Sequence, residues 1–185
     1  MTDINMQNIG LGCSEFSFAV YLANAPNMPE YQHINGVIPV INGEIDKIGV
    51  ECGNGWRKIF NVYAKLLYAL HPNDFAFLRS PPSWQAYRDR FLLQSGSENA
   101  LLFTAPILDI NSQKIHIISG KTYAKHLLAT GEIEVGLTWL DDEFAINEAN
   151  RLIVCPYFDY RQLSNIKIEH LSVMLSQFKN KNKIE

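Results

Sequence analysis

The stretch "ECGNGW" (51–56) places a thiol just before an amphipathic segment. Cys52 precedes an expected helix, and a helix N-terminus lowers the pKa of a nearby thiol. Papain-like proteases carry C-G-[SA]-C-[WY], in which the second cysteine is the nucleophile. In this chain Gly55 occupies that position, and spacing assigns no histidine partner to Cys52. We therefore favour a structural interpretation, in which Gly53 and Gly55 form a tight loop and Trp56 anchors a core helix.

A second stretch, "IISGKTYAKHL", contains the Gly-Lys-Thr tripeptide that ends a Walker A loop. That loop also needs a glycine at the position of Ile115, so a P-loop is excluded. An apolar strand still leads into a helix N-terminus, where free N–H groups favour an anion. Lys121 stands in the first turn, where its charge opposes the helix dipole, and a bound anion would explain this placement. The alternative is an ordinary turn, with Ser119 as the cap and Lys121 in solvent.

Two polar loops follow strands in the same way: "NAPNMPEY" (24–31) after the first, and "PYFDYRQLSN" (156–165) after the last. Open α/β sheets bind ligands at the carboxyl ends of their strands. If the strands run parallel, these loops and the Gly-Lys-Thr turn share one edge and form a site for a small anionic or nucleotide-like ligand. The predicted ligand-binding residues are Asn24, Asn27, Ser119, Lys121, Thr122, Tyr160 and Arg161. The alternative is three unrelated polar turns.

Neither a metal site nor a cofactor is indicated. The three cysteines form no C-x-x-C pair, and the chain has no G-x-S-x-G nucleophile elbow. The acidic run "LDDEF" (140–144) is explained by a helix start, where carboxylates complement the dipole. Catalytic residues stay unassigned, and whether the protein is an enzyme is open.

The charge limits the choice of partners. A net charge of −3 argues against general capture of nucleic acid, which needs a basic footprint. Residues 1–78 carry only four of the 16 Lys and Arg residues, so a basic patch in the second half stays open. The apolar runs are shorter than the roughly 20 residues of a membrane helix, and no signal peptide is recognised. We expect a soluble, cytoplasmic protein without membrane association; its oligomeric state is not indicated.

Periodicity and capping signals predict the elements. The clearest is a helix over 54–70, capped by Asn54 and stopped by Pro72. Further helices are expected over 80–96, capped by Ser80, and over 141–149, capped by Asp141. Two more are expected over 121–131 and 165–178. Strands are expected over 16–24, 99–108, 114–120 and 151–157, and residues 33–50 read as irregular with one short hairpin.

Strands and helices alternate, so the fold class is α/β. We expect a single domain over 1–178, with a mixed, mostly parallel sheet of four or five strands, helices on both faces, and a polar tail at 179–185. The link between 101–105 and 115–119 is short for a parallel crossover. Those two strands are therefore antiparallel neighbours or not neighbours at all.

Three short segments resemble the uracil-DNA glycosylase-like α/β superfamily. "ISGKTYAKHLL" looks like its strand and "G-K-x-A" helix, "IVCPYFDYRQLSN" is similar to its H-P-S loop, and "LANAPNMPEY" stands where it has G-Q-D-P-Y. Ala25 replaces the family aspartate and Cys155 the histidine. The resemblance implies that glycosylase activity is lost and that a cleft for a nucleotide, base or phosphate persists. It implies Asn24, Lys121 and Arg161 as binding residues.

The sequence alone does not determine the function. The favoured hypothesis is a bacterial-type α/β domain that binds a small anionic ligand, as a degenerate enzyme or a binding module. The alternative is a protein–protein interaction or structural protein with no small-molecule site. In that case the aromatic residues Trp139, Tyr157, Phe158 and Tyr160 would be exposed anchors for a partner.

Overall fold

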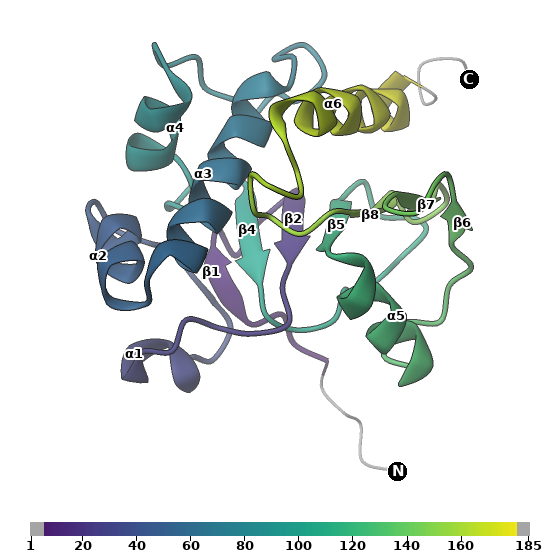
Figure 1. The fold of residues 1–185 in the computed structure, drawn as a ribbon, viewed down its shortest axis with the longest axis horizontal. Coiled ribbons are helices and arrows are strands. Elements are labelled where there is room, and N and C mark those ends of the chain that lie inside the picture. Colours follow the sequence, from purple (N-terminus) through teal and green to yellow (C-terminus); the bar gives the residue numbers. More distant parts are fainter. Residues whose placement is uncertain (1–5, 181–185) are drawn as a thin grey trace.

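A computed structural model describes residues 6–180, which form an eight-stranded mixed sheet flanked by helices (Figure 1). The strands are β1 (Gly10–Gly12), β2 (Phe18–Tyr21), β3 (Val37–Ile38), β4 (Asn99–Leu102), β5 (Ile115–Ser119), β6 (Thr138–Trp139), β7 (Ala145–Asn147) and β8 (Leu152–Cys155). Their order is β3-β1-β4-β2-β5-β8-β7-β6. The α/β class and the mixed sheet are confirmed. The predicted four or five strands are too few, because strands of two or three residues carry little periodicity.

The central strands β4, β2, β5 and β8 all run parallel, and antiparallel pairs lie on both flanks. Alternate residues of each central strand enter different cores, as the two-residue period of a strand requires. In β2, Phe18 and Val20 enter one core, whereas Ala19 and Tyr21 enter the other. All four side chains are fully buried, so both faces of the sheet are covered.

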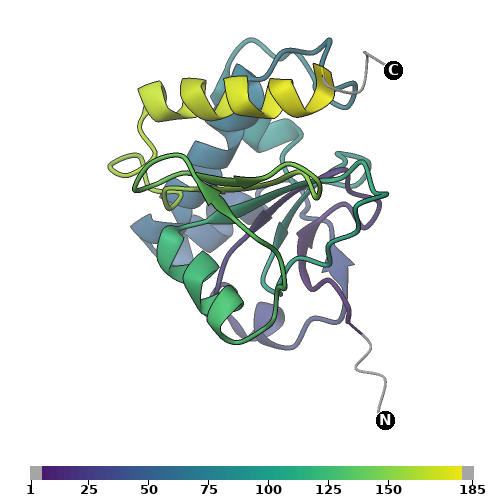
Figure 2. The same cartoon turned by 90° about the vertical axis from the view of Figure 1, so that its right-hand side faces the viewer.

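Six helices lie in the described part of the chain: α1 (Pro29–Gln32), α2 (Glu44–Glu51), α3 (Asn54–Ala69), α4 (Trp84–Arg90), α5 (Lys121–Ala129) and α6 (Asn165–Asn180). Helices α3 and α6 cover one face of the sheet, and α5 covers the opposite face (Figure 2). Tyr63 of α3 is fully buried and donates a hydrogen bond to the carbonyl oxygen of Ala100 at 2.9 Å. This bond ties the central helix to β4.

The predicted caps of α3 and α4 are wrong, although both helices form. Gly53, with φ of 89°, occupies the N-cap position of α3, and Asn54 is the first helical residue. Helix α4 begins later and ends earlier than the predicted 80–96, and its cap is Ser83 instead of Ser80. The Ser83 hydroxyl oxygen accepts the backbone N–H of Ala86 at 3.1 Å.

The predicted helix over 141–149 is wrong: the segment belongs to the β6–β7 hairpin. Asp141 Oδ1 accepts the backbone N–H groups of Glu143 and Phe144, each at 2.7 Å. The carboxylate thus makes the hydrogen bonds of a cap, but the turn it closes leads into a strand. The predicted hairpin in 33–50 is also wrong, because β3 pairs parallel with β1 and residues 44–51 form α2.

Strands β4 and β5 are parallel but are not neighbours, since β2 lies between them and pairs with both. The second alternative for this link is therefore correct. The crossover over 103–114 contains no helix, and its Ala105 and Leu108 pack against the core on the α5 side of the sheet.

Helix α6 continues through Lys179 and Asn180, the first two residues of the predicted tail. The rest of that tail, 181–185, lies outside the described residues. Within residues 6–180, no helix is long and apolar enough to cross a membrane.

Candidate functional site

A cavity of about 610 Å³ lies at the carboxyl ends of β5 and β8, over the start of α5. Its walls come from residues 119–123, from the β6–β7 loop and from the loop after β8. His126, from the second turn of α5, also lines it. We call this cavity the α5 pocket.

The turn from β5 into α5 is built tightly against β8. The backbone N–H of Gly120 donates to the Cys155 carbonyl oxygen at 2.9 Å. The buried Ser119 hydroxyl accepts the N–H of Phe158 at 3.0 Å. Gly120 has φ of 102°, in the left-handed region that favours glycine, and it occupies the N-cap position. The predicted Ser119 cap is therefore wrong, because the hydroxyl is already used between strand ends.

Three backbone donors lie at the start of α5. The N–H of Ala124 donates to the Gly120 carbonyl at 3.1 Å, as the first hydrogen bond of the helix. The N–H groups of Lys121, Thr122 and Tyr123 make no hydrogen bond to any described residue. All three residues line the α5 pocket. The positive end of the helix dipole adds to these donors, so this wall favours an anionic group.

Lys121 has partners within the protein. Its ammonium group donates to the Asp142 carbonyl oxygen at 2.8 Å and lies 5.3 Å from the centre of the Trp139 ring. The lysine thus joins α5 to the β6–β7 hairpin. Its placement in the first turn is explained by these contacts and does not itself require an anion.

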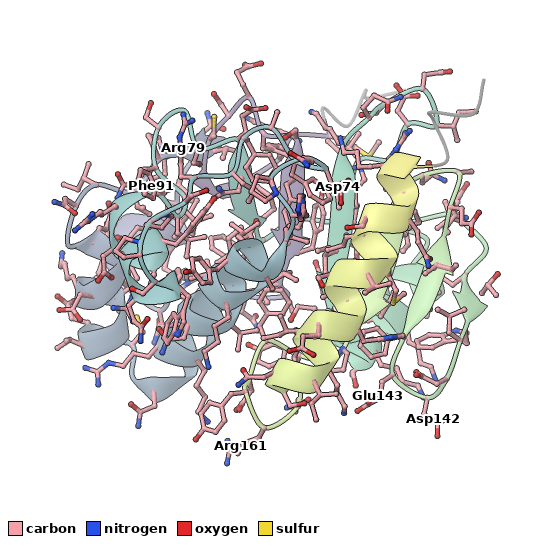
Figure 3. The ribbon with its side chains drawn as sticks, turned by 90° about the horizontal axis from the view of Figure 1, so that it is seen from above. Asp74, Arg79, Phe91, Asp142, Glu143 and Arg161 are labelled. Carbon is pink, nitrogen blue, oxygen red and sulfur yellow. The ribbon has the colours of Figure 1, made fainter. Side chains whose placement is uncertain are left out.

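The β6–β7 loop gives the α5 pocket an acidic wall. Asp142 and Glu143 come from the β6–β7 loop, and Figure 3 labels both on one side of the start of α6. Glu143 is held by Lys167 of α6, with an Oε2–Nζ distance of 2.6 Å. A ligand in the pocket would meet both backbone N–H donors and carboxylate acceptors.

Tyr160 and Arg161 lie outside the α5 pocket, in an ion-paired cluster with Lys58 of α3. Asp159 Oδ2 lies 3.1 Å from Arg161 Nη2 and 2.9 Å from Lys58 Nζ. The hydrogen bonds from Arg161, together with that from Lys58, hold the pKa of the Asp159 carboxyl well below its usual range. Lys58 Nζ also lies 5.1 Å from the centre of the Tyr160 ring. Arg161 is labelled in Figure 3 on the opposite side of the α6 start from Glu143.

The strands do run parallel, yet the structure brings together only three of the seven predicted residues. Ser119, Lys121 and Thr122 line the α5 pocket. Asn24 and Asn27 are exposed in the loop after β2, whose contribution to the pocket is Ala23.

The other lining residues of the pocket are not among the predicted ones, and His126, Asp142, Tyr157 and Gln162 are four of them. His126 is four residues after Thr122, and this helical spacing would have identified it. Tyr157 and Gln162 lie in the loop that the sequence did single out.

Neither Cys52 nor Cys155 is an activated thiol. Cys155 is fully buried, and burial raises the pKa of its thiol. Desolvation also raises the pKa of Cys52, despite its place just before α3. Among the proposed aromatic anchors, Phe158 is buried, whereas Tyr157 and Tyr160 are exposed. In the part of the chain that the structure describes, no group of three or more His, Cys, Asp and Glu side chains is arranged to hold a metal ion.

Residues 9–176 match the model of a protein family described as "Family of unknown function (DUF6942)". The match covers most of the chain, so the protein belongs to this family. No curated protein and no solved structure matches the chain.

Proposed function

We propose that the domain binds a small phosphate-bearing, nucleotide-like ligand in the α5 pocket. The observation that carries this proposal is the position of a cavity of about 610 Å³ over the free N–H groups at the start of α5. This is the edge at which open α/β sheets bind ligands, and the volume lies in the range of small-molecule sites.

The chemistry of the walls suggests how such a ligand is oriented. The phosphate group accepts hydrogen bonds from the N–H groups of Lys121, Thr122 and Tyr123. Tyr157, which is 39% exposed, offers an aromatic surface to a ring. Carboxylate oxygens of Asp142 and Glu143 accept hydrogen bonds from hydroxyl or amino groups.

The resemblance to the uracil-DNA glycosylase-like superfamily supports a nucleotide-like ligand and argues against glycosylase chemistry. Cys155 stands where that superfamily has a histidine, and its buried thiol with a raised pKa is a poor proton carrier. Ala25, at the place of the aspartate, has no group to activate water. We therefore propose binding without base excision.

Thr122→Glu tests the proposal. Thr122 is exposed at the second position of α5, where a carboxylate occupies the anion site and complements the dipole. In the wild type we expect inorganic phosphate and uridine monophosphate to raise the melting temperature. At a hundredfold excess of ligand over Kd, the free energy of unfolding should rise by about 2.7 kcal/mol. Uridine, which lacks phosphate, should act more weakly. The variant should lose these responses while its ligand-free stability is unchanged or higher by about 0.3–1 kcal/mol.

Gln85→Glu is the matched control, because Gln85 is the exposed second residue of α4 and the change adds the same charge. This variant should keep the full ligand response. The proposal fails if the wild type responds to no anion at millimolar concentration, or if Thr122→Glu responds as the wild type does.

A further inference from the structure

A second cavity, of about 670 Å³, lies between residues 106–110 of the β4–β5 crossover and residues 131–135 after α5. It begins where α5 ends and shares no lining residue with the α5 pocket. Leu108, Ile133 and Val135 give it an apolar floor, and Ile110 stands at its edge with 66% of its surface exposed. We call this cavity the acidic groove.

Among residues 6–180, every charged side chain that lines the acidic groove is a carboxylate: Asp109, Glu132 and Glu134. All three are exposed. Asp109 accepts the backbone N–H of Asn111, and Glu132 accepts the Thr130 hydroxyl, and both of these donors are uncharged. Glu132 Oε1 also lies 3.9 Å from Nε2 of His126. An apolar floor with a negative rim is complementary to a partner that combines apolar and basic side chains.

The backbone along the groove suggests the shape of that partner. Residues 133–137 are irregular and lead directly into β6, the edge strand of the sheet. The N–H groups of Glu134, Val135 and Leu137 donate to no described residue. Buried and exposed side chains alternate along this segment, since Ile133 is 4% exposed whereas its neighbours Glu132 and Glu134 are exposed. Unpaired strand-edge groups with alternating side chains are the features to which an added strand binds.

We propose that the acidic groove binds an extended peptide segment of another protein, in which apolar residues alternate with lysine or arginine. The peptide backbone pairs with the free N–H groups of Val135 and Leu137, which are two residues apart, as on one edge of a strand. Its apolar side chains lie on Leu108, Ile133 and Val135, because side chains of a strand point alternately to two sides. Its basic side chains reach the carboxylates of the rim.

The probe is a fluorescein-labelled heptapeptide of alternating lysine and valine, blocked at both ends. We expect its fluorescence anisotropy to rise on titration with the full-length protein, and its Kd to increase with salt. Amide NMR shifts should change at 106–110 and 132–137. A peptide with glycine for valine and one with glutamate for lysine should both bind at least about tenfold more weakly, because each lacks one half of the recognition.

Glu134→Lys and Ile110→Ser should each raise the Kd of the lysine–valine peptide by about fivefold or more, through lost charge and lost apolar contact respectively. Both residues are exposed, so the fold should persist, as circular dichroism would verify. Glu169→Lys on α6 and Val50→Ser on α2 are matched controls at exposed positions away from the groove, and they should leave Kd unchanged.

Three results would overturn the proposal. The first is no binding of the lysine–valine peptide, and the second is equal binding of the lysine–glycine peptide, which would mean attraction to net charge alone. The third is a dimer in light scattering that Ile110→Ser dissociates, since a second copy of the chain would then cover the groove.

Discussion

Acid should destabilise the protein through one buried histidine. His116 lies in β5 with 1% of its surface exposed, and its Nδ1 is 2.7 Å from the hydroxyl oxygen of Tyr21 in β2. Burial, with a smaller contribution from the charge of Lys114, lowers the pKa of His116 from 6.5 to about 4. The folded state therefore keeps the imidazole neutral at pH values where the unfolded chain protonates it.

The sign and size follow from proton linkage. Above pH 6.5 neither state protonates His116, so the histidine adds no pH dependence. Between pH 6.5 and about 4 only the unfolded state binds the proton, and stability falls as the pH falls. At 1.36 kcal/mol per pH unit, the free energy of unfolding drops by about 2 kcal/mol between pH 7 and 5, and by about 3 kcal/mol at pH 4.

Urea unfolding at pH 7, 6 and 5 measures this slope. The window lies above the ordinary pKa values of the carboxyl groups, which are about 4. His116→Asn is the comparison, since its side-chain oxygen can still accept from Tyr21 but does not titrate. We expect this variant to be less stable at pH 7, because the smaller side chain leaves a void. Its free energy of unfolding should nevertheless change less with pH than that of the wild type. Parallel pH profiles for the two proteins would refute the assignment of the acid sensitivity to His116.

Two further predictions concern the core. Leu67→Asp should lower the free energy of unfolding by an amount on the order of 3–5 kcal/mol, or unfold the protein, because Leu67 is 1% exposed on α3. Ala69→Asp, on the exposed side of the helix, should shift the melting temperature only slightly. Equal melting temperatures for the two variants would contradict the packing of this helix. A thiol reagent should label the half-buried Cys52 first, and Cys155 should react only after denaturation. Mass spectrometry of the labelled peptides distinguishes the two cysteines. Rapid labelling of Cys155 in the native protein would show that β8 is accessible.

The sequence predicts long elements better than short ones. The helix over 54–70 is found almost residue for residue, because its apolar positions repeat over four turns. Strands β3 and β6 have two residues each. Strand β6 pairs with β7 in a local hairpin whose sequence predicts a helix, whereas β3 pairs with β1, far away in the chain. No local pattern reports such pairing, so the sheet is underestimated.

The candidate site shows the same limit. The start of α5 follows from the local Gly-Lys-Thr pattern, and Lys121 and Thr122 do line the pocket. The sequence does not predict the acidic wall, because an aspartate followed by further acidic residues is also the pattern of a helix start. In the structure Asp141 does accept two N–H groups as a cap would, but in the turn of a hairpin. Arg161 was assigned to the site by its position after β8, but Asp159 holds its guanidinium elsewhere.

Helix α5 separates the two proposed sites and makes their tests independent. Its first turn forms a wall of the α5 pocket, and Gly131, just beyond its last turn, lines the acidic groove. Nine residues at 1.5 Å each give a helix of about 13 Å. His126 of the α5 pocket lies 3.9 Å from Glu132 of the acidic groove, but the substituted residues Thr122 and Glu134 are not part of this pair. Thr122→Glu should therefore leave peptide affinity unchanged, and Glu134→Lys should leave the phosphate response unchanged. The loss of both responses in either variant would mean that the substitution disturbs α5 itself, and neither site could then be assigned from that variant.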